Sequence, residues 1–416
     1  MDTQTFEFNP DSERFSSDPY SDYAWLREHA PVFDWSARGA LVVSGMAELR
    51  TYFGEPRLSA DAREWELYPG DALFEQPRYA AWRRIKRAGV ELAPADHARV
   101  RKLASRALTP SGVRQMEATV QAAVDQAIAE LLERDEEVVN ICEFAERIPL
   151  EVMCRLLGVP DEFRGQFRRF AQAMIRSLQP FGDIEVLNGI ADAVAEGVAM
   201  LEQMIGEVRS ASVRPDNLLG AWVEANEDDE RLSDDEMMAL VAVLIIAGTD
   251  TTVHGTCYAI HGLLSHPEAL RELRAEPELL RGAIEETLRW DGFGKLALMR
   301  YATESFELCG TPVRKGQMVI GLGGAANRDP KVFSEPDRFD IRRDPQANIT
   351  FGHGRRYCLG ANLARTEMML AVRSLLIERF PEAELAGPVV IDHRNPILRA
   401  MTQLPLRLGP DHGSRG

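Results

Sequence analysis

A single cysteine in a glycine-rich segment has the surroundings of a metal ligand. The segment Phe351–Gly360 reads FGHGRRYCLG, with its cysteine at position 358. Gly352 and Gly354 permit backbone conformations closed to other residues and let the chain approach a flat ligand closely. We expect Cys358 at the start of the final helix, where unpaired amides and the helix dipole favour a thiolate. Such a thiolate is a strong donor to a haem iron, although an isolated cysteine in such a turn is more often a small buried hydrophobe.

A second segment with chemical potential interrupts an apolar helix. Ala247–Thr252 reads AGTDTT. An aspartate there is costly unless it is paired, hydrogen-bonded or protonated. We expect the Thr251 hydroxyl to bond the carbonyl of Ala247, which bends the helix and opens a groove beside Thr251 and Asp250. The pattern is equally typical of a kinked core helix in which Asp250 forms a structural salt bridge.

Two further groups of charged residues have helical spacing. Glu286 and Arg289 lie three apart and share a helix face, where an exposed pair contributes only about 0.3–0.5 kcal/mol, so we interpret them as structural. The segment His97–Arg106 holds four basic residues and no acid. His97 and Arg101 lie four apart and can meet one anion together, or belong to a solvated basic helix face.

The rest of the chain, which must position these groups, reads mainly as helix. A capping box at Ser233–Glu236 predicts the start of a long helix that ends near Leu264. A final helix is expected over about 359–378, and helices are expected after Pro94, Pro110, Pro160 and Pro267.

Strands and loops occupy the remaining region before the final helix. Short alternating runs over 297–320 predict hairpin strands, and 325–357 predicts an irregular ordered meander. Gly321–Ala326 matches the GxGxxA dinucleotide fingerprint, but Asn327–Pro330 ends any helix within two turns, so we reject it. No flexible linker is found, which predicts one mainly α domain with a small β region over 1–416, with flexible ends at 1–14 and 409–416.

Composition excludes several classes of protein. A net charge of −17 argues against nucleic-acid partners. The N-terminus lacks the apolar core of a signal peptide, and the longest apolar run, Met237–Gly248, is shorter than the roughly 18 residues that span a bilayer. We therefore expect a cytoplasmic protein with no membrane association. The odd, scattered cysteines, without a CxxC pair, argue against disulfide, zinc-ribbon and iron–sulfur frameworks. Four of them are predicted to be small buried hydrophobes: Cys142, Cys154, Cys257 and Cys309.

Taken together, these segments resemble the cytochrome P450 family over roughly residues 15–408. The haem-binding signature of the family, Phe-x-x-Gly-x-Arg/His-x-Cys-x-Gly, is matched by Phe351, Gly354, Arg356, Cys358 and Gly360. The oxygen-binding helix motif and the Glu-x-x-Arg pair follow in the family's order and spacing. One minor departure is Leu108, where phenylalanine is commoner.

The resemblance implies a single-domain, mostly α prism with a small β region and haem b between the long helix and the last one. It implies that Cys358 is the axial iron ligand, that Asp250 brings protons in and that Thr251 stabilises activated dioxygen. The implied cofactor contacts are His97, Arg101, Gly248, Arg300, Phe351, Arg356, Cys358 and Gly360. Glu286, Arg289 and a meander arginine, Arg338, are implied to support the cysteine loop.

The implied reaction is R–H + O₂ + two electrons + two protons giving R–OH + water, a hydroxylation or epoxidation in secondary or xenobiotic metabolism. Because the chain has no flavin, nicotinamide or iron–sulfur motif, electrons from NAD(P)H must arrive through a separate ferredoxin and ferredoxin reductase. The expected docking patch for this donor consists of Arg99, Lys102, Arg106 and Arg355. We expect a monomer that acts on a small apolar substrate.

Two alternatives remain open from the sequence. One is a haem-thiolate peroxygenase driven by hydrogen peroxide, and the other is a haem-binding sensor without turnover; the Asp250–Thr251 pair argues against both. The sequence does not name the substrate, although the chain resembles members that act on macrolides, terpenoids or fatty acids. The segments expected to line the pocket are 64–90, Val243, Ile246, Ala247, 296–298 and 398–401.

Overall fold

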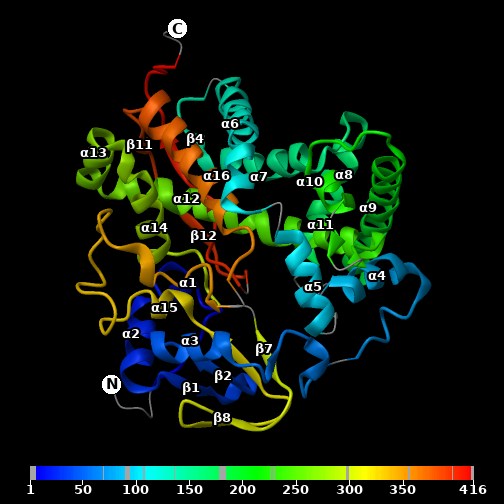
Figure 1. The fold of residues 1–416 in the computed structure, drawn as a ribbon. Coiled ribbons are helices and arrows are strands. Elements are labelled where there is room, and N and C mark those ends of the chain that lie inside the picture. Colours follow the sequence, from blue (N-terminus) through cyan, green and yellow to red (C-terminus); the bar gives the residue numbers. More distant parts are fainter. Residues whose placement is uncertain are drawn as a thin grey trace.

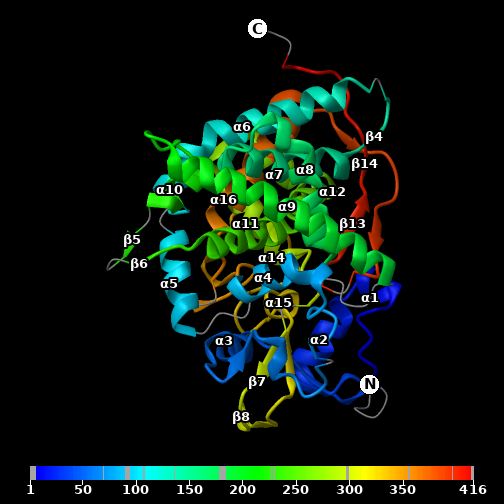
Figure 2. The same cartoon turned by 90° about the vertical axis from the view of Figure 1, so that its right-hand side faces the viewer.

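The computed structural model describes residues 6–68, 70–89, 94–105, 108–134, 136–177, 184–224, 226–227, 230–296, 299–354, 357–395 and 397–413, with the backbone alone at 94–97, 226–227 and 230. Helices form most of the molecule, and a small sheet lies at one end of it, below the helices in Figure 1. Turned by a quarter, the molecule shows α6, α7 and α9 towards one end and β7 and β8 at the other (Figure 2).

The helices follow the sequence in a mainly antiparallel stack. They are α1 (Glu13–Ser17), α2 (Tyr20–His29), α3 (Met46–Gly54), α4 (Ala80–Gly89), α5 (Pro94–Ser105), α6 (Pro110–Leu132), α7 (Ile141–Leu157), α8 (Arg164–Arg176), α9 (Ile184–Ser210), α10 (Leu218–Glu224), α11 (Asp234–Gly248), α12 (Asp250–Ser265), α13 (Pro267–Ala275), α14 (Leu280–Trp290), α15 (Gly323–Ala326) and α16 (Ala361–Val372), which continues as a π-helix over Arg373–Arg379. The predicted starts after Pro94, Pro110 and Pro267 are confirmed, and a short 3₁₀ turn separates Pro160 from α8.

The long central helix is confirmed and is broken where the sequence indicated. The Ser233 hydroxyl accepts from the Glu236 amide and the Glu236 carboxylate accepts from the Ser233 amide, so the predicted capping box is present. Thr249, with φ −86° and ψ −75°, separates α11 from α12. The Thr251 hydroxyl donates to the carbonyl of Ala247, as expected for a back-bonded threonine that loosens the ladder.

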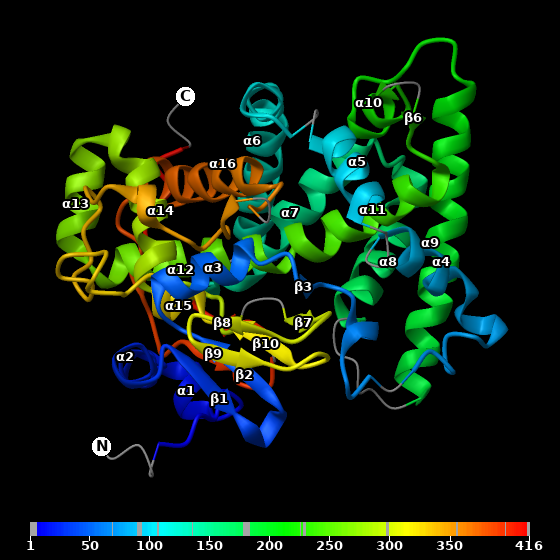
Figure 3. The ribbon, with the colours of Figure 1, turned by 60° about the horizontal axis from the view of Figure 1, so that its bottom comes forward.

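Five short strands form the main sheet, which Figure 3 brings to the front. In spatial order they are β1 (Val32–Trp35), β2 (Ala40–Val43), β10 (Met318–Gly321), β7 (Arg300–Ala302) and β3 (Leu58–Ser59). The β2–β10 pair is parallel and the other three pairs are antiparallel. β2 is buried along its whole length because alternate residues pack into apolar clusters on opposite faces of the sheet.

The predicted hairpin region is confirmed as β7, β8 (Phe306–Leu308), β9 (Thr311–Val313) and β10. The remaining strands were not predicted: β1, β2, β3, β4 (Val139–Asn140), β5 (Asn226–Glu227), β6 (Glu230–Arg231), β11 (Glu384–Leu385), β12 (Val390–Asp392), β13 (Ala400–Gln403) and β14 (Pro405–Arg407). α15 has four residues, so the helix that a dinucleotide fingerprint requires is not there. The meander is confirmed as irregular, with one 3₁₀ turn at Pro345–Ala347 between β10 and the cysteine loop.

Two predictions about the ends and the cysteines need correction. The flexible N-terminal end does not hold for residues 6–14, because Phe6 stacks on Trp25 and Phe8 is buried. Cys142, Cys154 and Cys257 are buried as expected. Cys309 is instead exposed, because it occupies the tight β8–β9 turn with a φ of 49°.

The central helix Asp234–Ser265 is long and apolar enough, by length and composition, to cross a membrane. However, 56% of its most apolar window is buried inside the protein. In this protein it is a core helix, packed between α7 and α16.

Candidate active site

The cysteine loop has the strained turns that its glycines indicated. Gly352 and Gly354 have φ of 79° and 57°, in the region that favours glycine. The Cys358 amide donates to the carbonyl of Phe351 at 2.8 Å, which closes the loop. Cys358 lies two residues before Gly360, the N-cap of α16, so the predicted position at the start of the last helix is confirmed.

The electrostatics of Cys358 differ from expectation. Burial raises the pKa of its thiol, while the Gly360 amide, Arg101 and Arg365 lower it by less. The helix start therefore does not favour the thiolate by itself, because the low polarity around the sulfur outweighs the nearby amide and cations. A coordinated metal ion supplies the stronger positive charge that deprotonates a thiol.

A salt bridge that the sequence analysis missed ties this loop to α14. Arg365, on the first turns of α16, pairs with the buried Glu285, stacks over the Phe351 ring at 4.1 Å and donates to the Tyr357 hydroxyl at 2.9 Å. The only available signal was the adjacency of Glu285 to the Glu-x-x-Arg pair. Arg365 thus fixes both sides of the cysteine loop from a rigid helix.

The Glu286–Arg289 pair is confirmed as buried structure. Both side chains are 2% exposed, and two hydrogen bonds of 2.7 and 2.8 Å join them. Arg289 also donates to the meander carbonyls of Asn327 and Pro336 at 2.9 and 2.8 Å. The pair therefore anchors the meander to α14.

The meander arginine of this network is Arg343, and the choice of Arg338 is wrong. Arg343 lies 3.3 Å from the Glu286 carboxylate and is 13% exposed. Arg338 contributes only its backbone carbonyl, which accepts from Arg289 at 3.1 Å. Its side chain is 62% exposed and pairs with Glu335, because the turn at 335–338 directs it outwards.

Asp250 and Thr251 begin α12, immediately after the break at Thr249. Burial raises the pKa of the Asp250 carboxyl. Over the described parts of the chain, no ion pair or hydrogen bond of that carboxylate is found, so the structural salt bridge that the sequence left open is absent there. On the same helix, Val243 is 42% exposed and Ala247 is also exposed, although both lie within an apolar core helix.

Three of the remaining predicted residues can be placed. Arg101, on α5, donates to the carbonyl of Tyr357, so α5 lies against the cysteine loop. Arg300 begins β7 and its guanidinium donates to the Met299 carbonyl at 3.0 Å. Gly248 ends α11, and an added Cβ there would meet Met153 at 3.5 Å. The side chain of His97 and the whole of Arg356 lie outside the described residues.

Comparison with known proteins decides the family. The Cytochrome P450 family model matches residues 79–402. The chain belongs to the cytochrome P450 family. It is 35% identical over 409 residues to epothilone C/D epoxidase of Sorangium cellulosum, covering 97% of this chain and 96% of that protein. It is 34% identical to 6-deoxyerythronolide B hydroxylase of Saccharopolyspora erythraea, covering 96% and 98%.

Solved structures agree with this family and its fold. Epothilone B-bound cytochrome P450epoK superposes with a TM-score of 0.87 at 34% identity, covering 97% of this chain and 100% of that one. The predicted P450 prism, mainly α with a small β region, is therefore confirmed. The protein is a haem-thiolate monooxygenase with haem b as cofactor, dioxygen as cosubstrate and NAD(P)H as the ultimate electron source.

The donor set of this cytochrome P450 fits haem better than a bare metal ion. Among the residues that the structure describes, no group of three or more His, Cys, Asp or Glu side chains could hold a metal ion. A metal bound by Cys358 must therefore take its other ligands from a macrocycle, which haem provides. The apolar surface at Val243 and Ala247 suits the face of such a flat ligand.

The basic patch predicted for an electron donor is only partly supported. Arg99 pairs with Glu236 at the start of α11 and its side chain is 19% exposed, so it faces the protein. Lys102 is exposed on α5. Arg106 and Arg355 lie outside the described residues.

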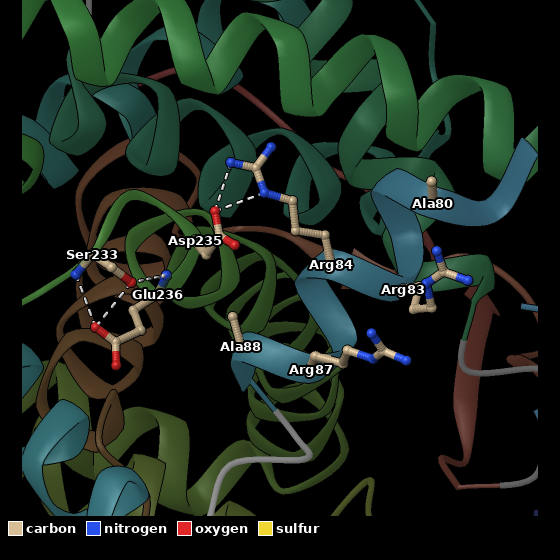
Figure 4. A pocket seen from close by; sticks show the side chains of 8 residues that line it. All are labelled: Ala80, Arg83, Arg84, Arg87, Ala88, Ser233, Asp235 and Glu236. Atoms are coloured by element: carbon tan, nitrogen blue, oxygen red, sulfur yellow. Dashed lines mark hydrogen bonds and ion pairs between the residues drawn. The ribbon is translucent and has the colours of Figure 1, made fainter. Parts of the chain in front are cut away.

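The segment 64–90, expected to line the substrate pocket, reaches the central helix through α4. A Cβ added at Gly89 would lie 3.4 Å from Ala239 and 3.8 Å from Val243. Beside this contact, a cleft of about 500 Å³ lies between α4 and the start of α11. Figure 4 shows Arg84 turned towards Asp235, while Arg83 and Arg87 point away from it. The mouth of the site is thus bordered by arginines, and its inner wall at Val243 is apolar.

Proposed function

We propose that Cys358 is the axial ligand of the haem iron and that the break between α11 and α12 is the oxygen-activating side of the site. The observation that carries this proposal is the packing of α16, which follows Cys358, on α12, which begins with Asp250. The Met368 sulfur lies 2.7 Å from the position of a Cβ on Gly255, so the two helices are in close contact. When bound, haem supplies the activation of dioxygen and the insertion of one oxygen atom into the substrate.

The residues around the cysteine loop have separate tasks in this proposal. Arg101 and Arg300 bind the haem propionates, together with His97 and Arg356. Phe351, Gly360 and Gly248 leave room for the ring; a Cβ added at Gly360 would meet nothing within 4 Å. Glu286, Arg289 and Arg343 hold the meander, and through it the loop.

Thr251 and Asp250 control hydrogen bonds and protons. The Thr251 proton is directed to Ala247, so the hydroxyl oxygen is free to accept a hydrogen bond from the pocket, whereas donation towards dioxygen requires its side chain to rotate. Asp250 lacks a cation in the described structure and its pKa is raised by burial. It can therefore carry a proton at a higher pH than an exposed aspartate.

Electrons arrive from a separate protein in this proposal. Bacterial members of the family generally use separate redox partners and small substrates. We propose a ferredoxin with its ferredoxin reductase, docking on the α5 face beside the cysteine loop, and a cytoplasmic monomer. Charge reversal at Lys102 should slow stopped-flow haem reduction by a ferredoxin more at low salt than at high salt. Lys315→Glu, in the turn before β10, is the matched control, and equal effects of the two reversals would refute this dock.

The proposed substrate is a large, mainly apolar polyketide such as a macrolactone. The relatives named for epothilones and 6-deoxyerythronolide B support this class, as does the apolar wall at Val243. The test is a screen of macrolactones for a shift of the haem from low to high spin. With a binder in hand, ferredoxin-driven turnover under ¹⁸O₂ should place one labelled atom in the product. Turnover supported by hydrogen peroxide but not by the ferredoxin system would favour the peroxygenase alternative.

A further inference from the structure

Helix α7 runs antiparallel along the central helix, and two contacts fix its register. The sulfur of Cys142 lies 3.8 Å from that of Cys257. The end of Met153 lies 3.5 Å from the position of a Cβ on Gly248. As α7 advances from Cys142 to Met153, the central helix therefore passes from Cys257 back to Gly248.

Glu146 and Asp250 lie on the facing sides of these two helices. Cys142, Glu146 and Met153 follow the i, i+4, i+11 spacing of one helix face, and both neighbours of Glu146 in this set contact the central helix. Asp250 lies seven residues before Cys257, on the same face as that cysteine. The electrostatics agree with this placement, because the pKa of Glu146 is raised by burial and then by the negative charge of Asp250.

The two acids differ in their access to water. Glu146 is exposed, whereas Asp250 is half-buried. Beside Glu146, Arg147 borders a surface cleft of about 690 Å³ between α6 and α7. One end of the acid pair therefore meets solvent and the other meets the helix break.

The charges around the pair leave it without a cation in the part of the chain that the structure describes. Arg147 is the nearest cation along α7 and forms its ion pair with Glu130 of α6. Glu143, which also raises the pKa of Glu146, pairs with Arg134. From the central helix, Cys257 faces Glu146 in addition to Asp250, and it stays neutral because burial and Cys142 raise the pKa of its thiol.

We propose that Glu146 is the entry residue of the proton path and passes protons from bulk water to Asp250. In each step the Glu146 carboxyl O–H bond breaks, an O–H bond forms on the Asp250 carboxylate, and Glu146 takes a new proton from water. No electrons move in this step, and two such transfers supply the two protons of one monooxygenation. The inference rests on the role proposed for Asp250.

The test compares three variants of the haem-loaded protein: Glu146→Gln, Asp250→Asn and the control Glu143→Gln. Oxygen uptake is driven by NADPH with a surrogate ferredoxin and reductase, without an organic substrate, in H₂O and in D₂O. Glu146→Gln should slow uptake about tenfold and enlarge the solvent isotope effect, because a positioned acid is lost. Glu143→Gln should resemble the unaltered protein, and the absorption of the reduced carbon-monoxide complex verifies that each variant is folded and loaded.

A second readout is independent of turnover. Infrared titration of the carboxyl C=O bands identifies Glu146 by the band that Glu146→Gln removes. Asp250→Asn should lower the pKa of Glu146, because it removes the neighbouring negative charge. An unchanged titration of Glu146 in that variant, or an unchanged rate and isotope effect in Glu146→Gln, overturns the inference. If Asp250→Asn slows uptake while Glu146→Gln does not, only the entry residue is wrong; if neither does, the role of Asp250 is wrong as well.

Discussion

Two interior carboxylates in this cytochrome P450 differ in what surrounds them. Glu286 is 2% exposed, accepts two hydrogen bonds from Arg289 and one from the Asp340 amide, and is approached by Arg343. Asp250 has no ion pair in the described parts of the chain, and burial raises its pKa. A fixed network holds the first acid charged, and the second is free to change its protonation state. The difference separates residues that hold the site from residues that act in it.

Removal of the fixed acid should have the largest effect. Glu286→Gln leaves the Arg289 guanidinium buried without its counter-charge, and breaking a buried pair costs about 3–5 kcal/mol. We expect a large loss in the free energy of unfolding and failure to retain haem. Denaturant unfolding and the haem-to-protein ratio measure this. A stable, fully loaded variant would show that the network is not the support we describe.

Removal of the unpaired acid should affect turnover and spare stability. Asp250→Asn should slow ferredoxin-driven oxygen consumption by about 10²–10⁴-fold, the usual contribution of a positioned proton donor. Its free energy of unfolding at neutral pH should not fall, because no ion pair is lost. The same two measurements, made on both variants, place them at opposite corners. A destabilised Asp250→Asn variant with normal turnover would reverse the comparison.

Glu367 offers a third interior acid, and its effect should be a moderate pH dependence of stability. It is 1% exposed on α16, one carboxylate oxygen has no partner in the structure, and burial raises its pKa from 4.5 to about 8. Ionisation is thus harder in the folded state, so this group's contribution to stability is complete below pH 4.5 and is lost as the pH rises to about 8.

Glu367→Gln should therefore gain unfolding free energy relative to the unaltered protein between about pH 5 and pH 8.5. Urea unfolding at both pH values measures it. Glu378→Gln is the control, because Glu378 is 53% exposed and pairs with Arg373. A constant difference between Glu367→Gln and the unaltered protein would mean that Glu367 is solvated in the folded state.

The smallest expected effect separates two meander arginines. Arg343→Gln should cost about 1.5–3 kcal/mol, the range for a hydrogen bond to a charged group, since it removes a partner of Glu286. Arg338→Gln should stay within about 0.5 kcal/mol, because that side chain is exposed. Parallel unfolding curves would test the assignment, and equal losses would contradict it.

The sequence predicted features that depend on local patterns. The capping box at Ser233, the back-bonded Thr251 and the loop ending at Cys358 each need only a few neighbouring residues, and all three are confirmed. The mainly α fold follows from helical periodicity and from the family resemblance.

Features that depend on distant partners were missed. Arg338 and Arg343 lie five residues apart in one irregular segment, and only the path of the meander decides which one reaches Glu286. β2 becomes a central strand because β10, almost 280 residues later, pairs with it. Arg365 acquires its role from Glu285 on another helix. No local pattern contains these pairings.

The central claim, that Cys358 holds the haem iron, is tested most directly by the spectrum of the reduced carbon-monoxide complex. Thiolate ligation gives this complex a red-shifted Soret band. The account predicts that the unaltered protein and Cys309→Ala, which changes an exposed cysteine in the β8–β9 turn, both show the band. It predicts that Cys358→Ala loses it. Retention of the red-shifted band in Cys358→Ala would contradict the account.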